Sequence, residues 1–145
     1  MKNTIFKGVA TALITPLDEN GIRYDDFGRL IDWQIESGIN ALVVCGTTGE
    51  ASTLTDDEHR DAIAYCVKRA AGRVPVIAGT GSNDTAYALD LTKSACEAGA
   101  DAVLVVTPYY KISSSTHMQP WLHLCPDRRF LSLLHDRGIH SPVQE

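Results

Sequence analysis

The sequence has little of what marks several large classes of protein. Its four cysteines lie 21, 30 and 29 residues apart without a CxxC pair, which argues against a zinc ribbon and a disulfide scaffold. Thirteen Lys and Arg face eighteen Asp and Glu, whereas nucleic-acid-binding domains are usually basic. No uncharged apolar run approaches the roughly 18 residues that cross a bilayer. We also find no signal-peptide pattern. We therefore expect a cytoplasmic protein without nucleic-acid or membrane partners.

The residues that are present describe a globular chain with a change of composition near residue 111. The 145 residues are 44% hydrophobic and 21% charged, which suits one domain of ordinary size. Residues 1–110 carry nine basic and fifteen acidic residues and ten of the eleven glycines. Residues 111–145 carry four basic and three acidic residues and four of the five histidines. We therefore treat 1–110 and 111–145 as two different segments.

Four apolar runs alternate with amphipathic segments in the first segment. They begin 33, 33 and 28 residues apart, and each interval fits one strand followed by one helix. This alternation predicts an α/β protein with a parallel sheet and right-handed crossovers. The dipeptide Asn20-Gly21 predicts a turn. The predicted strands cover residues 8–14, 41–45, 74–78 and 102–106.

Three helices are predicted between these strands. The first covers residues 25–37, where apolar residues recur at helical spacing. Thr55 and Glu58 have the spacing of a capping box at the start of the second. Ser82 or Asn83 is the expected cap of the third. In the second segment, the only helix that we predict is a short one over residues 128–136.

Three loops at the carboxyl ends of predicted strands are candidates for function, because ligands of parallel α/β proteins bind at that edge. They cover residues 45–50, 78–83 and 107–110. In Gly46-Thr-Thr-Gly-Glu50, glycines allow a sharp turn that exposes backbone N–H groups to a carboxylate or phosphate. The two hydroxyls can orient such a ligand and pass a proton. An equal alternative is a plain turn in which Thr47 or Thr48 caps a helix.

The other candidates in the chain have weaker patterns. Gly79-Thr-Gly81 lacks the GxGxxG spacing and the lysine of a Walker loop, so we interpret it as a tight turn that needs small residues. We expect His59 at the surface or in loop packing, and the irregular spacing of the other histidines predicts no metal site. Cys45, Cys66 and Cys96 have the apolar surroundings of buried thiols.

Four segments together carry a resemblance to a known family. GVATALITPLDENG, CGTTGEASTLTDDEH, VPVIAGTGSN and VVTPYY, in this order, resemble the 4-hydroxy-tetrahydrodipicolinate (dihydrodipicolinate) synthases of the pyruvate-dependent class I aldolase superfamily. The resemblance covers about residues 5–110. It implies a TIM (β/α)8 barrel, of which residues 1–110 supply the first four βα units, and a homotetramer. It also implies a lyase that condenses pyruvate with L-aspartate 4-semialdehyde through a Schiff base in lysine (diaminopimelate) biosynthesis, without a metal or other cofactor.

The resemblance assigns roles to individual residues. Thr48 matches the residue that binds the pyruvate carboxylate. Thr47 and Tyr110 match members of a proton relay, in which Tyr110 comes from the neighbouring subunit. Tyr109 matches its companion at the dimer interface. Positions that bind the inhibitor lysine in regulated members are matched or neighboured by Ser52, His59, Asn83 and Tyr109.

This sequence also departs from the family's pattern. The Schiff-base lysine on the sixth strand and the relay tyrosine after the fifth have no counterpart in it. Lys111 follows TPYY where the family has Asn. Asp56 stands where some regulated enzymes have His, and Tyr87 where they have Glu. We therefore expect this chain to be inactive alone and residues 111–145 to be a non-family tail, frameshifted or disordered.

Three alternatives stay open from the sequence. The chain could be a non-catalytic half barrel or interaction protein. It could be a fragment of another pyruvate aldolase, such as an N-acetylneuraminate lyase or a 2-keto-3-deoxy-sugar-acid aldolase, although the former typically have Ser where Thr47 stands. It could also be a small flavodoxin-like nucleotide binder.

Overall fold

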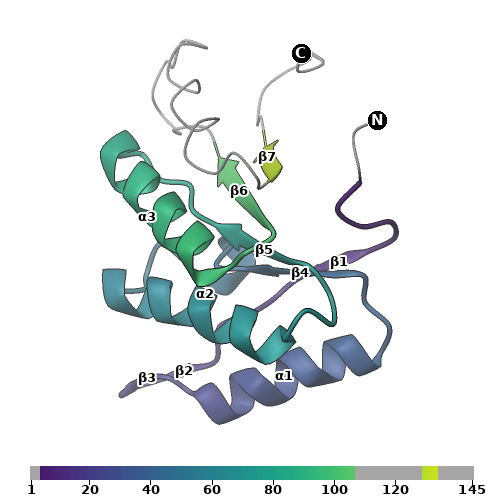
Figure 1. The fold of residues 1–145 in the computed structure, drawn as a ribbon. Helices are drawn as coiled ribbons and strands as arrows, with labels where there is room; N and C mark the ends of the chain where they lie inside the picture. Colours follow the sequence, from purple (N-terminus) through teal and green to yellow (C-terminus); the bar gives the residue numbers. More distant parts are fainter. Residues whose placement is uncertain (1–3, 107–128, 134–145) are drawn as a thin grey trace.

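The main sheet is parallel and its strands follow one another in chain order. The computed structural model describes residues 4–106 and the backbone of residues 129–133 (Figure 1). The order β1-β4-β5-β6-β7 differs from a flavodoxin-like sheet, in which the first strand lies inside. In a partial barrel, neighbouring strands follow one another in chain order, as they do here. The strands are β1 (Ala10–Ala12), β4 (Ala41–Val44), β5 (Val76–Gly79), β6 (Ala102–Val106) and β7 (Arg129–Leu133).

Three helices connect the strands and lie next to one another along one side of the sheet (Figure 1). They are α1 (Tyr24–Glu36), α2 (Asp56–Ala70) and α3 (Thr85–Ala98), as predicted from the helical spacing. The predicted capping box of α2 is confirmed: Thr55 accepts from the Glu58 N–H, and the Glu58 side chain accepts from the Thr55 N–H at 2.9 Å.

Two local predictions need correction. The cap of α3 is Asp84, one or two residues beyond the expected Ser82 or Asn83; its carboxylate accepts from the N–H groups of the first turn. The first strand is limited to Ala10–Ala12 instead of residues 8–14. The predicted turn at Asn20-Gly21 closes a small separate hairpin of β2 (Leu17–Asp18) and β3 (Gly21–Ile22).

The prediction of a helix over residues 128–136 is wrong. Residues 129–133 form β7, which pairs in parallel with β6 over five residue pairs from Ala102↔Arg129 to Val106↔Leu133. The free edge of β6 offers unpaired N–H and C=O groups, and a strand that pairs with them satisfies both chains. This backbone pairing prevailed over the helical spacing of the apolar residues.

The core lies between the sheet and the helices. Alternate strand residues point to it: Leu42 and Val44 of β4 are fully buried against α1 and α2 in the larger apolar cluster. Ala41 and Val43 point to the opposite face, where a smaller cluster includes Ile77 and the N-terminal Phe6. Within the described residues, helices therefore cover one face of the sheet and not the other. No helix among the described residues is long and apolar enough to span a membrane.

Candidate functional site

The loop after β4 makes two sharp changes of direction. Cys45, the residue that follows the strand, has a left-handed backbone with φ 54°, which is uncommon for a residue other than glycine. Gly46 is extended, Thr47–Gly49 form a single 3₁₀ turn, and Glu50 is again left-handed with φ 53°. The loop is therefore a compact turn at the carboxyl edge of the sheet and not the start of α2.

Both threonines of this loop are exposed, and neither caps a helix. The 3₁₀ turn begins at Gly46 without a side-chain cap, and Thr55 caps α2. This contradicts the alternative in which Thr47 or Thr48 serves only as a helix cap. Their hydroxyls stand at the surface of the described chain, where they can meet a ligand or another part of the protein.

Thr15 ties the end of this loop to the segment after β1. Its buried hydroxyl donates a hydrogen bond of 2.8 Å to the carbonyl of Gly49. A Cβ added to Gly49 would lie 3.1 Å from the carbonyl oxygen of Leu13, so the loop sits close against the first segment. Thr15 was not predicted from the sequence, because nothing local marks a contact over 34 residues.

The loop after β5 is packed tightly, which confirms its interpretation as a turn that needs small residues. A Cβ on Gly79 would lie 2.0 Å from the carbonyl oxygen of Cys45, and one on Gly81 would lie 2.7 Å from the N of Val106. Between the glycines, the hydroxyl of Thr80 is fully buried and accepts a 2.8 Å hydrogen bond from Thr92. This loop uses its polar groups internally.

A cavity of about 440 Å³ lies between the two loops. Thr47 and Ser52 line it, whereas Thr48 and Asn83 do not. Its lining comes from the ends of β4, β5 and β6 and from the starts of α2 and α3. The lining residues are Cys45, Gly46, Thr47, Ala51, Ser52, Leu54, His59, Gly79, Gly81, Ser82, Tyr87, Leu104 and Val106.

His59 lies at the wall of this cavity. The expectation that it packs against a loop is confirmed, and the alternative of a surface position is wrong: the residue is only 4% exposed. Its Nε2 lies 2.8 Å from the carbonyl oxygen of Gly79, which can only accept, so Nε2 carries a proton. Burial lowers the pKa of His59 and favours the neutral ring.

Cys45, which lines the cavity, and Cys66 are buried thiols and not nucleophiles. Burial raises the pKa of both Cys45 and Cys66 to about 12, so both are protonated thiols at neutral pH. Their predicted burial is confirmed, whereas Cys96 is only half-buried. The Cys45 thiol faces the His59 carbonyl with an S···O distance of 3.8 Å.

A polar network lies at the start of α2 and α3. The guanidinium of Arg60 donates to Asp56 at 3.0 Å and to Asp90 at 2.7 Å. The hydrogen bond from Arg60 lowers the pKa of Asp56, while burial and a hydrogen bond with Asp56 raise the pKa of Tyr87. Asp56 therefore already has a cationic partner.

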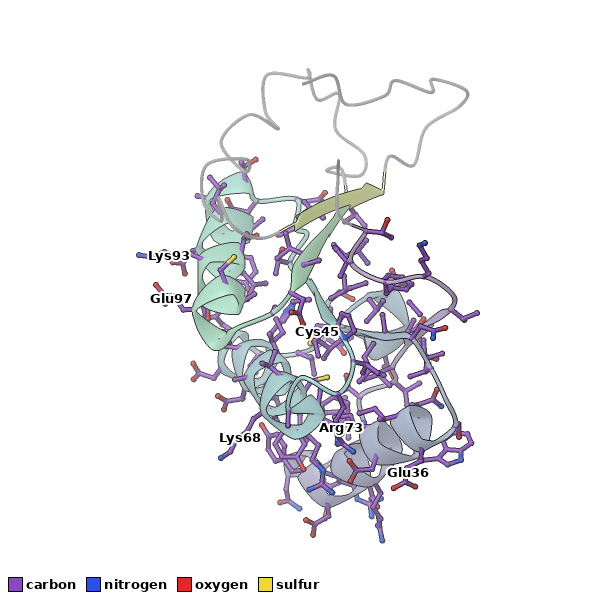
Figure 2. The ribbon with its side chains drawn as sticks, turned by 45° about the vertical axis from the view of Figure 1, so that its right-hand side comes forward. Glu36, Cys45, Lys68, Arg73, Lys93 and Glu97 are labelled. Atoms are coloured by element: carbon purple, nitrogen blue, oxygen red, sulfur yellow. The ribbon has the colours of Figure 1, made fainter. Side chains whose placement is uncertain are left out.

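None of the lysines in the described part of the chain lines the cavity. Lys68 and Lys93 point outward from α2 and α3, away from Cys45 at the end of β4 (Figure 2). Lys93 lies 4.0 Å from the carboxylate of Glu97 on the same helix. Within residues 4–106, no group of three or more His, Cys, Asp and Glu side chains is arranged to hold a metal. Tyr109, Tyr110 and Lys111 lie outside the described residues.

The consecutive parallel strands, the helices on one side and the loops at the carboxyl edge define a partial (β/α)8 barrel. A model of the dihydrodipicolinate synthetase family matches residues 5–123. The chain belongs to this family, whose curated members are lyases. This finding also removes the flavodoxin-like alternative.

Curated relatives support the same assignment. A 4-hydroxy-tetrahydrodipicolinate synthase of Acetivibrio thermocellus is 57% identical over 110 residues, which are 76% of this chain and 38% of the relative. One from Nitratidesulfovibrio vulgaris is 56% identical over 105 residues, or 72% of this chain and 36% of the relative. The chain thus spans well under half the length of these relatives.

Solved structures agree with the fold. Dihydrodipicolinate synthase from Aquifex aeolicus matches with a TM-score of 0.80 and 45% identity over 88% of this chain and 44% of that chain. The enzyme from Cyanidioschyzon merolae, solved with lysine bound, has a TM-score of 0.82 and 33% identity over 90% of this chain and 46% of that chain.

Proposed function

We propose that this chain supplies the substrate-binding loop of a lyase that condenses pyruvate with L-aspartate 4-semialdehyde in lysine biosynthesis. The observation that carries the proposal is the loop Gly46–Glu50, which presents two exposed threonines at the carboxyl edge of the sheet. The family membership and the name of the curated relatives support this substrate pair over those of other pyruvate aldolases.

In this proposal, the two threonines have different roles. Thr48 binds the pyruvate carboxylate through its N–H and hydroxyl, and Thr47 passes a proton between two tyrosines. Tyr110 is one of these tyrosines, contributed by a neighbouring subunit, and Tyr109 packs at that interface. The cavity wall at Thr47 supports a position where a hydroxyl can reach both a ligand and a partner side chain.

Binding of pyruvate tests the role of Thr48. In a ¹⁵N-labelled sample of the chain, added pyruvate should shift the amide signals of Thr47 and Thr48, and Thr48→Val should weaken the binding. Thr53→Val is the matched control, because Thr53 is also an exposed threonine and its hydroxyl bonds only the nearby Glu50 carbonyl in the structure. Equal binding in both variants would remove Thr48 from the site.

We further propose that the chain does not catalyse the condensation alone. The reaction needs an amine that forms an imine with pyruvate. The lysines of the described part face solvent on the helices or near the N-terminus, and none lines the cavity. Borohydride reduction in the presence of pyruvate should therefore leave the mass of this chain unchanged, while a full-length synthase gains one reduced pyruvate. A stable adduct on this chain, mapped to one lysine, would contradict the proposal.

A non-catalytic half barrel is the second candidate. The helix-free face of the sheet favours it, because a partial barrel exposes apolar side chains such as Val43 and Leu104 that are only half-buried here. We expect the isolated chain to form oligomers, with a broad thermal transition. A monodisperse monomer with a sharp transition in sedimentation and calorimetry would contradict this expectation.

The two-segment organisation is also a proposal. We infer a family segment over residues 1–110 and a different segment over 111–145. The family match reaches residue 123, and β7 extends the sheet. Residues 111–123 are therefore the stretch in which the boundary is tested. The DNA sequence across codons 105–115 tests a frameshift directly: a restored frame that continues the family pattern supports it, and an unambiguous frame as translated here contradicts it.

A further inference from the structure

Two anchors from distant parts of the chain hold the loop 46–50, one at each end, besides the local bond from Thr53 to the Glu50 carbonyl. The first is the hydroxyl of Thr15, which donates to the carbonyl of Gly49 at 2.8 Å. Thr15 is 5% exposed, and Gly49 is buried although its neighbours Thr48 and Glu50 are exposed. The anchor therefore fixes the one part of the loop that faces the interior.

The second anchor reaches the start of the loop through the neighbouring strand. The imidazole of His59 donates to the carbonyl of Gly79 at 2.8 Å and so fixes the end of β5. The missing side chain of Gly79 leaves room for the carbonyl of Cys45, whose oxygen would lie only 2.0 Å from a Cβ at Gly79. The thiol of Cys45 in turn contacts the backbone carbonyl of His59. His59, Gly79 and Cys45 thus form a closed set of contacts.

The backbone of Cys45 shows what this second anchor does. A left-handed conformation is unfavourable for a residue with a Cβ and persists where surrounding contacts determine it. Here it turns the chain away from β4 so that Gly46 is extended and the two threonines follow at the surface. The contacts to Gly79 and His59 therefore help to keep Cys45 in this conformation and the chain after β4 in this direction.

We propose that Thr15 and His59 are positioning residues, which act through Gly49 and through Gly79 and Cys45 to hold Thr47 and Thr48 in the orientation that receives the substrate carboxylate. Neither side chain needs to touch the substrate. This inference rests on the proposed function of the threonines, but the holding of the loop can be measured separately from binding.

Hydrogen exchange on the full 145-residue chain tests the inference. Thr15→Val and His59→Leu remove one donor each. Each should speed exchange of the amides in the loop by about tenfold, as expected for the loss of one buried hydrogen bond, relative to α3 in the same sample. Thr15→Ser and His59→Gln keep a donor and should restore the exchange rate of the original chain.

Thr92→Val is the matched control. It also removes a buried hydroxyl hydrogen bond, to Thr80, but lies on α3 and makes no described contact with the loop 46–50. The comparison with α3 within each sample separates loop opening from general loss of stability. If one loss variant fails to fold, the other and its conservative partner decide. Loop exchange no faster in Thr15→Val and His59→Leu than in Thr92→Val would overturn the inference.

Pyruvate is the second probe. Its affinity, measured by amide shifts, should fall in the two loss variants and recover in the two conservative ones, while Thr92→Val leaves it unchanged. If the original chain binds no pyruvate, the proposed function fails and the exchange rates still decide whether Thr15 and His59 hold the loop. Affinity that falls equally in Thr92→Val would show a general effect of stability and overturn the positioning role.

Discussion

The two loops beside the cavity are built in opposite ways from similar residues. Both follow a buried parallel strand, and both contain glycine and threonine. In the loop 46–50, the threonine side chains are exposed and the backbone is held from outside, by Thr15 and the end of β5. In the loop after β5, Thr80 is buried and its hydroxyl pairs with Thr92.

This difference separates a loop whose threonines face outward from a loop whose threonine is used inside the chain. Gly79 and Gly81 have no side chains because backbone and side-chain atoms of neighbouring strands occupy that space. Glycine is therefore needed at these two positions for close packing and not for phosphate binding. Thr47 and Thr48 are exposed in the described chain, which is what their proposed role in binding requires.

The largest effect that we predict concerns turnover in a full-length enzyme that contains this segment. Thr47→Val should lower turnover by on the order of a hundredfold to ten-thousandfold, because it keeps the shape but breaks the proton path. Tyr110→Phe should cost a similar factor, and the double variant little more than either single one, because the residues act as a unit. Thr48→Val should mainly raise the pyruvate concentration required.

Turnover and melting temperature measured on the same variants provide the control. If Thr47 only shapes the loop, its substitution would lower stability by at most about 1 kcal/mol, as is usual for an exposed side chain, and leave turnover intact. Normal turnover in both Thr47→Val and Tyr110→Phe would eliminate the relay. The two loops would then no longer differ in function.

The second effect is on stability and concerns Gly79 at the end of β5. Gly79→Ala should destabilise the chain by about 3 kcal/mol. The new Cβ would meet the backbone carbonyl of Cys45, which cannot move aside as a flexible side chain could. Gly46→Ala is the matched control in the other loop: its φ is −80°, and the nearest atom to the new Cβ is a methyl of Val43 at 3.6 Å. We expect a cost there below about 1 kcal/mol. Urea unfolding of the two variants measures the difference, and equal losses would contradict it.

A third prediction concerns the ligand of the cavity. The resemblance places lysine inhibition near Ser52, Asn83 and Tyr109, and Tyr87 takes the place of a glutamate there. No carboxylate is among the described residues that line the cavity, and the neighbouring Asp56 already pairs with Arg60, so neither offers a partner for an ammonium group. We therefore expect lysine to inhibit a full-length enzyme with this segment weakly or not at all. Tyr87→Glu should introduce inhibition, and potent inhibition of the original enzyme would contradict the prediction.

Most of the fold followed from apolar periodicity and local caps. The strands at residues 41–45, 74–78 and 102–106 were predicted within two residues of their observed ends, because a buried parallel strand is marked by its own sequence. The cap of α3 was missed by one residue or two. Ser82, Asn83 and Asp84 can all accept from backbone N–H groups, and only the path of the loop selects Asp84.

The features that were not predicted depend on contacts between distant parts of the chain. β7 forms because the edge of β6 is available for pairing, which no local pattern reveals. Thr15 and His59 act on residues 34 and 20 positions away. The exposed threonines were found from sequence, whereas the residues that hold them required the structure.

The smallest effect that we predict is a pH dependence of stability through His59, which supports both loops. Burial lowers the pKa of this imidazole, and the nearby Arg60 acts in the same direction, while the hydrogen bond to Gly79 and the charge of Asp56 oppose it. The unfolded chain therefore binds a proton more readily than the folded chain. The contribution is complete above the unfolded pKa, about 6.5, and is lost as the pH falls below it toward the folded value. The paired carboxylates Asp32 and Asp56 have lowered pKa values, so their contribution is lost only at more acidic pH.

His59→Gln isolates this effect, since glutamine keeps a donor for the Gly79 carbonyl but does not titrate in this range. Urea unfolding between pH 8 and 5.5 should show the original chain losing more stability than the variant, although the other four histidines titrate in both. The difference between the two curves belongs to His59 alone. Parallel curves would mean that His59 has the same proton affinity in the folded and unfolded chain, and its neutral ring would then not be what holds Gly79 beneath the loop.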